Sequence, residues 1–125
     1  MSNRSKVDDK WAEFLGHHDG VIGLYALFSK GVCRYVGKAD CLASRLKHHL
    51  RKRDDVDEIR VWDLRDEVKG LSYEGTKAMH KWREDALIHK MRPVENIKRH
   101  SMHEDRFFSL PMDVKQKLIA KLPDL

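Results

Sequence analysis

Two neighbouring apolar segments constrain this fold more than any other feature of the sequence. Residues 21–28, Val-Ile-Gly-Leu-Tyr-Ala-Leu-Phe, are apolar almost throughout, and residues 32–37, Val-Cys-Arg-Tyr-Val-Gly, follow after three residues. A short apolar run bounded by turn residues is typical of a strand that is covered on both faces. The two segments therefore predict a β-hairpin in the centre of the fold.

The loop between the two segments sets the expected register of this hairpin. Ser29-Lys30-Gly31 fits a three-residue loop whose last residue is left-handed. Such a loop places Phe28 opposite Val32, and counting outward pairs Tyr25 with Tyr35. Directly paired residues project from the same face of a sheet, so two phenols are expected side by side. The same count pairs Gly23 with Gly37, which leaves open space beside the phenols.

The rest of the chain predicts helices and one further strand. Leu42, Leu46 and Leu50 recur every four residues and predict a helix over residues 41–53, capped by Asp40. Arg45 and His49 form a parallel stripe at the border of its buried face. The remaining elements are a helix near residues 7–15, a strand at 58–64, a loop containing Gly70 and Gly75, a helix at 76–91 and an amphipathic helix after Pro111.

One acidic residue lies where a core residue is expected. In the helix predicted at 76–91, Glu84 shares a face with Leu87, Ile88 and Met91. A carboxylate on an apolar stripe costs free energy unless a cation or hydrogen-bond donors compensate it. Ion pairs with lysines or arginines of the same helix are one explanation, and a bound metal ion is the other.

Charge and composition narrow the class of partner. The chain has 25 basic and 20 acidic residues, a net charge of +5, and a pI of about 9.3, which favours an anionic partner. No apolar run approaches the roughly 20 residues that span a bilayer, and no secretory signal is present, so we expect no membrane partner. Two cysteines, Cys33 and Cys41, are too few for a disulfide scaffold and predict reduced thiols in a cytoplasmic protein.

These residues together resemble the GIY-YIG nuclease family. Gly23-Leu24-Tyr25 is followed ten residues later by Tyr35-Val36-Gly37, and the resemblance extends over roughly residues 20–97. The further matching positions, in the family's order, are Lys38, Arg45, His49, Glu84 and Asn96. Leucine and valine replace the isoleucines of the family name, which is a mild change at strand-packing positions.

The resemblance implies an α+β fold with a small, mainly antiparallel sheet of three strands flanked by helices. Residues 19–100 would form the nuclease core, residues 1–18 an N-terminal helical extension, and residues 101–125 a C-terminal helical tail packed on the core. It also implies an endonuclease that hydrolyses phosphodiester bonds, usually in DNA, with one divalent metal, Mg²⁺ or Mn²⁺.

The resemblance assigns a role to each matched residue. Tyr25 would take the proton from water, and Glu84 would be the one protein ligand of the metal. The supporting catalytic positions would be Tyr35, Lys38, Arg45, His49 and Asn96. A free phenol has a pKa of about 10, so Tyr25 would need positive neighbours, which Lys38, Arg45 and His49 could supply.

Two basic runs could follow a nucleic-acid backbone. The residues concerned are Lys47, Arg51, Lys52, Arg92, Lys98 and Arg99. Two alternatives to a free-standing nuclease remain open: a nucleic-acid-binding module of the same fold without turnover, or a nuclease subunit that acts only with a protein partner or as a homodimer.

Overall fold

The described part of the chain forms an antiparallel sheet of three strands in the order β2-β1-β3. The computed structural model describes residues 11–95 and 110–121. The hairpin is formed by β1 (Gly23–Ser29) and β2 (Val32–Ala39), and β3 (Glu58–Asp63) pairs with the other edge of β1. This arrangement confirms the expected α+β class.

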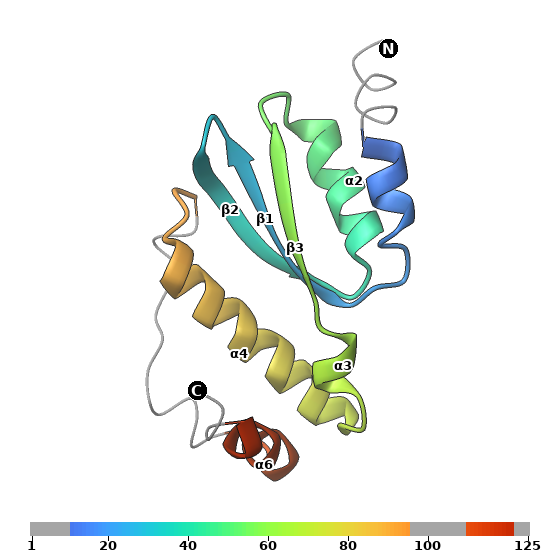
Figure 1. The fold of residues 1–125 in the computed structure, drawn as a ribbon, viewed down its shortest axis with the longest axis vertical. Coiled ribbons are helices and arrows are strands. Elements are labelled where there is room, and N and C mark those ends of the chain that lie inside the picture. Colours follow the sequence, from blue (N-terminus) through green and yellow to red (C-terminus); the bar gives the residue numbers. More distant parts are fainter. Residues whose placement is uncertain (1–10, 96–109, 122–125) are drawn as a thin grey trace.

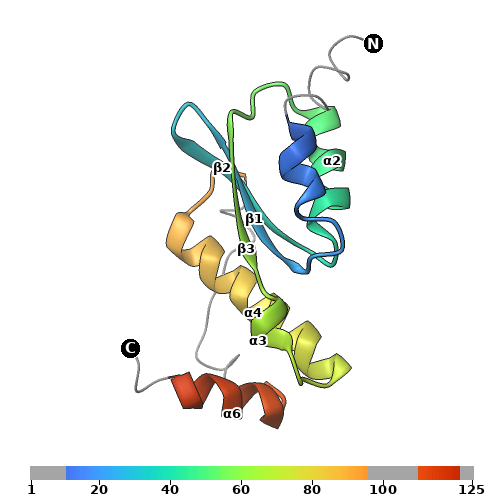
Figure 2. The same ribbon diagram turned by 45° about the vertical axis from the view of Figure 1, so that its right-hand side comes forward.

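Helices cover both faces of the sheet (Figures 1 and 2). On one face lie α2 (Leu42–Lys52) and the helical residues 11–16, and on the other lies α4 (Tyr73–Met91). The central strand β1 is buried from Gly23 to Phe28, as its almost continuous apolar sequence predicts.

The period of two along β1 divides the core between these two layers. Tyr25 and Leu27 pack with Leu42 and Leu46 of α2. Ala26 and Phe28 face the opposite way and pack with Ile88 of α4. Helices α2 and α4 therefore pack against opposite faces of the same strand, β1.

The hairpin loop is shorter than the sequence predicts. It consists of Lys30 and Gly31 alone, both with positive φ, 53° and 80°, the conformation of a type I′ turn. Ser29 therefore pairs with Val32, and a β-bulge in β2 then shifts the register between Leu27 and Phe28.

The predicted pairing of Tyr25 with Tyr35 is consequently wrong. Tyr25 lies opposite Gly37, and Tyr35 lies opposite Leu27. Because residues two apart on a strand share a face, the two phenols still project from the same face, as diagonal neighbours. The bulge coincides with a second contact on this edge of β2, where the amide of Glu95 donates to the Arg34 carbonyl at 2.9 Å.

Two helix starts also differ from the sequence prediction. Asp40 does not cap α2, because the N-cap position is Cys41, which makes no side-chain capping bond. Helix α4 begins at Tyr73 rather than Thr76, with the Ser72 hydroxyl accepting from the Gly75 amide at 2.9 Å. Gly75 therefore lies inside the helix and not in a loop.

The C-terminal helix explains why α4 starts early. Helix α6 (Met112–Lys121) lies at the N-terminal end of α4, away from the sheet (Figure 1). Its Asp113 carboxylate accepts from the Ser72 amide at 3.0 Å, and Gly75 leaves room for that carboxylate. The Lys117 ammonium donates to the Asp66 carbonyl of the short helix α3 (Arg65–Val68) at 3.0 Å. Within residues 11–95 and 110–121, no helix is both long and apolar enough to cross a membrane.

Candidate active site

A buried tyrosine forms the centre of the candidate site. Tyr25 on β1 has no exposed surface, and its hydroxyl lies 2.7 Å from Nε2 of His49 on α2. A Cβ atom at position 37 would lie 2.6 Å from Tyr25 Cζ and 3.0 Å from Tyr35 Cε2. Glycine at position 37 is therefore required because the ring of Tyr25 lies directly over the backbone of β2.

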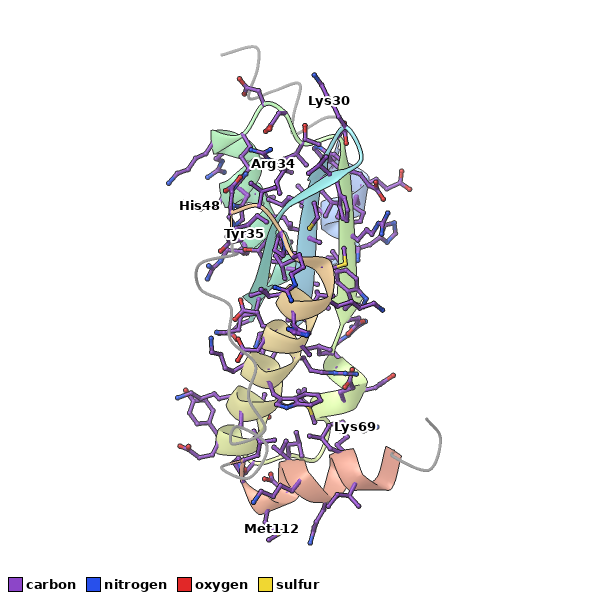
Figure 3. All side chains as sticks on the ribbon, turned by 90° about the vertical axis from the view of Figure 1, so that its left-hand side faces the viewer. Lys30, Arg34, Tyr35, His48, Lys69 and Met112 are labelled. Carbon is purple, nitrogen blue, oxygen red and sulfur yellow. The ribbon has the colours of Figure 1, made fainter. Side chains whose placement is uncertain are left out.

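Tyr35 and His49 complete an aromatic cluster around this phenol. The ring centroids of Tyr25 and Tyr35 are 6.1 Å apart, and those of Tyr35 and His49 are 5.0 Å apart. The Arg53 guanidinium lies 5.5 Å from the Tyr35 ring centroid and is held by two hydrogen bonds of 2.6 and 2.8 Å to Glu95. Figure 3 shows Tyr35 on the same flank of the molecule as Arg34 and His48.

Burial decides the protonation of the hydrogen-bonded pair. Burial, followed by the neighbouring Tyr35, raises the pKa of Tyr25, and Arg45 only partly opposes this. Burial, followed by the charge of Arg53, lowers the pKa of His49 to about 4. Both groups are therefore neutral near pH 7. Arg45 lowers the pKa of the phenol as expected, but the net shift is upward, because desolvation is the larger effect and His49 carries no charge.

Glu84 lies on the part of α4 that approaches this cluster. Its side chain is 12% exposed, and its charge contributes to the raised pKa of Tyr25. Oε1 of Glu84 is 3.7 Å from the ammonium of Lys81, which is also 3.5 Å from Oδ1 of the buried Asp85. The carboxylate is thus partly exposed, paired with Lys81, and close enough to Tyr25 for its charge to act on that pKa.

The donor set around Glu84 fits one kind of metal ion. Among the described residues, no three His, Cys, Asp or Glu side chains are grouped so that they could hold a metal together. Mg²⁺ needs no such cage, since it keeps several waters and is often held by one or two carboxylates plus substrate phosphates. The Lys81 ammonium beside Glu84 provides the ion pair within the helix that the sequence also allowed, and a bound metal ion would have to displace it. A single hard oxygen ligand therefore suits Mg²⁺ or Mn²⁺ and not a site built like those for zinc.

Arg45 brings positive charge to Tyr25, whereas the charge of Lys38 acts on His80 of α4. Arg45 is exposed one turn before His49 on α2, and its charge lowers the pKa of both Tyr25 and His49. Lys38 is exposed near the end of β2, opposite Leu24. Asn96, Lys98 and Arg99 lie outside the described residues.

Solved structures identify the fold that this chain adopts. No protein-family model matches the sequence, and no curated protein matches it. The structure is similar to the N-terminal GIY-YIG endonuclease domain of UvrC from Thermotoga maritima, in an asparagine-to-alanine variant bound to its catalytic divalent cation. That match has a TM-score of 0.50 and 23% identity, and it covers 69% of this chain and 93% of the other. The chain has the GIY-YIG endonuclease-domain fold. The magnesium-bound form of the same UvrC domain matches with a TM-score of 0.49 and 22% identity, over 70% of this chain and 97% of the other.

The basic residues of α2 divide between two flanks of the GIY-YIG fold. At 100° per residue, Lys52 shares the flank of Arg45 and His49, as does the exposed His48. Lys47 and Arg51 lie on the opposite flank, where they line a groove of about 420 Å³ against the helical residues 11–16 and Asp19. Arg92 is exposed where α4 ends, in a left-handed conformation.

A second groove does not involve the candidate residues. It has a volume of about 510 Å³ and lies between α4 and β3, lined among others by Trp62, Arg83 and Leu87. Leu24 of the first tripeptide also lines it, but none of the residues to which the resemblance assigns a catalytic or metal-binding role does. Its position on the far edge of the sheet from β2 separates it from the aromatic cluster.

Sequence reasoning missed three polar residues near the site. Asp85 and His80 are buried on α4, and His48 stacks edge-on against His49 with ring centroids 6.1 Å apart. For His80 a signal existed, because it lies four residues before Glu84 and therefore on the same face of the helix. The sequence offered no comparable reason to single out Asp85 or His48.

Proposed function

We propose that this chain is a metal-dependent endonuclease that hydrolyses phosphodiester bonds in DNA with one metal ion. The 2.7 Å contact between the Tyr25 hydroxyl and His49 Nε2 carries the proposal, because it joins two neutral groups that can move a proton. Tyr35, Arg45 and Glu84 surround this pair with an aromatic ring, a cation and an acid. The net charge of +5 is consistent with a polyanionic substrate.

The neutral pair suggests how the attacking water loses its proton. Phenolate is scarce near pH 7 because burial raises the pKa of Tyr25. As the phenol oxygen accepts the proton of the water, its own proton passes to Nε2 of His49, which becomes an imidazolium. Tyr25 is thereby the general base, and His49 stores the proton until solvent or the leaving oxygen takes it.

Exposure decides how water reaches this pair. Tyr25 has no exposed surface, whereas Tyr35 is half-buried. Tyr25 can receive the proton directly only when the ring of Tyr35 moves aside, and otherwise receives it through the Tyr35 hydroxyl. Both routes require the Tyr25 hydroxyl, so its loss is expected to lower cleavage by about 10²- to 10⁴-fold. Only the second route requires the Tyr35 hydroxyl, so a similar loss in Tyr35→Phe protein would identify that route.

The other side chains would bind and stabilise the phosphate. The planar guanidinium of Arg45 suits the two non-bridging oxygens, and Lys38 would add a point charge. Glu84 would hold the metal, which when bound supplies a Lewis acid for the developing negative charge. Lys52 would contact the backbone of the bound strand next to Arg45. Lys47 and Arg51 lie on the other flank of α2, and Arg92 lies at the end of α4. These three side chains would contact only a longer duplex.

A plasmid assay tests this proposal. Purified protein is expected to nick supercoiled DNA with Mg²⁺ or Mn²⁺ and not with a chelator. Glu84→Gln keeps the size of the side chain and removes its charge, and it is expected to lower the rate about 10²- to 10³-fold, the equivalent of roughly 3–4 kcal/mol. Glu74→Gln, on the exposed first turn of α4, is the matched control and should cleave normally.

The same assay separates the alternatives. A wild-type protein that binds DNA but never cleaves it, with any metal, would instead be a binding module. Cleavage that begins only when a cell extract is added would identify a nuclease subunit that depends on a partner. A screen of duplex, flap, fork and junction substrates then defines which DNA structure is cut.

A further inference from the structure

A buried histidine links the helix of the candidate metal ligand to the strand of the candidate base. His80 lies on α4 with a side chain that is 5% exposed, and its Nε2 is 2.9 Å from the carbonyl oxygen of Gly23 on β1. A carbonyl oxygen only accepts hydrogen bonds, so Nε2 of His80 must carry the proton. The other ring nitrogen, Nδ1, faces the exposed carboxylate of Asp40, whose Oδ1 is 3.8 Å away.

The position of this bond relates it to the candidate site. Tyr25 is two residues beyond Gly23, about 7 Å along the strand, and Glu84 is four residues beyond His80, about 6 Å along the helix. Figure 1 shows β1 and α4 running in the same general direction from this point. Both residues thus lie a short way beyond the same hydrogen bond, and the charge of Glu84 contributes to the raised pKa of Tyr25.

The carbonyl of Gly23 is a rigid anchor for His80. A Cβ atom at position 23 would collide with the backbone oxygen of Trp62 on β3 and lie 3.0 Å from Leu42 Cδ1 on α2. The backbone of β1 is therefore closely packed at this residue, against β3 and α2, on the side where a Cβ would lie. A helix that is hydrogen-bonded here cannot slide along the sheet without breaking a buried hydrogen bond.

Burial keeps the ring of His80 in the form that this role requires. Burial lowers the pKa of His80 and the charge of Lys38 acts in the same direction, while the hydrogen bond to Gly23 and the charges of Asp40 and Glu84 oppose this without reversing it. A neutral imidazole has one N–H, which is committed to Gly23, and leaves Nδ1 as an acceptor. An apolar residue at this position would leave the Gly23 carbonyl without this donor.

We propose that His80 is a positioning residue that holds Glu84 at a fixed distance from Tyr25 through its hydrogen bond to the Gly23 carbonyl. The proposal rests on the function proposed above, because it assigns His80 to the geometry of that site. Its consequence is that metal binding at Glu84 depends on a donor at the Nε2 position of residue 80, and not on a histidine as such.

Three variants and one control test this dependence. His80→Gln can place its amide nitrogen near the Nε2 position, whereas the shorter His80→Asn cannot reach Gly23 and His80→Leu removes the donor. His89→Asn, at an exposed position of the same helix, is the control. Each protein is examined well below its melting temperature for Mn²⁺ affinity, by electron paramagnetic resonance of the free ion, and for plasmid cleavage.

We expect the donor and not the imidazole to decide the result. Misplacement by about 1 Å can lower a rate about 100-fold, so His80→Asn and His80→Leu should lose cleavage on this scale and bind Mn²⁺ at least several-fold more weakly. His80→Gln should stay within about fivefold of the wild type in both, because it restores the bond. Folded His80→Asn protein with wild-type Mn²⁺ affinity and cleavage would overturn the proposal. So would His80→Gln protein as impaired as His80→Asn.

Nitrogen-15 resonance of the wild-type histidines provides a test that needs no variant to fold. The proposal requires the Nε2–H tautomer of His80, and the Nδ1–H tautomer would refute it. The Mn²⁺ series also separates the two proposals: if no DNA is cleaved by the wild type, the proposed function fails, while the order of Mn²⁺ affinities still decides the role of His80.

Discussion

Gly37→Ala tests directly whether Tyr25 must lie against the backbone of β2. The added methyl would begin 2.6 Å from Tyr25 Cζ, and ordinary contact starts at 3.4 Å, so one of the two must move by 3.4 minus 2.6, or 0.8 Å. Tyr25 cannot move freely, because it is fully buried and hydrogen-bonded to His49. Overpacking of this kind typically costs about 1–3 kcal/mol.

The same displacement should affect the reaction more than the stability. A shift near 1 Å in a positioned group can lower a rate about 100-fold, whereas about 1–3 kcal/mol leaves a typical domain folded at low temperature. We therefore expect Gly37→Ala protein to unfold at a lower temperature and, while still folded, to cleave about 100-fold more slowly. Thermal unfolding and plasmid nicking at 20 °C or below measure the two effects.

Gly16→Ala is the matched control, because a Cβ atom there has nothing within 4 Å. Residue 16 ends the helical segment 11–16, so alanine should be neutral or stabilise the fold by a few tenths of a kcal/mol, about the propensity difference. If Gly37→Ala protein keeps wild-type stability and cleavage, the packing of Tyr25 on β2 does not determine the site.

Three further predictions follow from the geometry. The pKa of His49 falls from 6.5 to about 4 on folding, so between these pH values the unfolded chain binds more protons than the folded chain. The free energy of unfolding should therefore fall as the pH is lowered through this window. Urea unfolding should show a shallower decrease for His49→Gln protein. Lys30→Asn should stabilise the hairpin by roughly 0.5–1 kcal/mol, because Lys30 has a φ of 53° that asparagine tolerates better; a loss of stability would count against the type I′ turn. Arg45→Lys should lose most of the cleavage rate and keep the fold, since an ammonium cannot make the bidentate phosphate contact; full activity would show that only its charge matters.

The strands and helices were largely predictable, because their signals are local. The apolar run of β1 indicates a strand covered on both faces, and the leucine stripe of α2 indicates its buried face. Glu84 was also recognisable, since an acid on an apolar stripe needs an explanation. These predictions depend on residues within one or two turns or strands of one another.

The details that fix the site depend on distant residues and were not predictable. The bulge in β2 accompanies the pairing of Glu95 with Arg34, and the early start of α4 depends on Asp113. Burial also outweighs the lowering of the Tyr25 pKa by Arg45, because a sequence shows the charges but not the desolvation. The spacing of His80 from Glu84 placed both on one helix face, but its hydrogen bond to the Gly23 carbonyl depends on a residue 57 positions away and could not be predicted.

The central claim is that a metal held by Glu84 lies beside the phenol pair. The most direct test is a titration of the protein with Mn²⁺, which broadens the magnetic resonances of nearby side chains. We predict that the ring signals of Tyr25, Tyr35 and His49 broaden first, that the methyl of Met112 on α6 does not, and that Glu84→Gln abolishes the effect. Broadening that is unchanged by Glu84→Gln, or that begins away from the aromatic cluster, would contradict the claim.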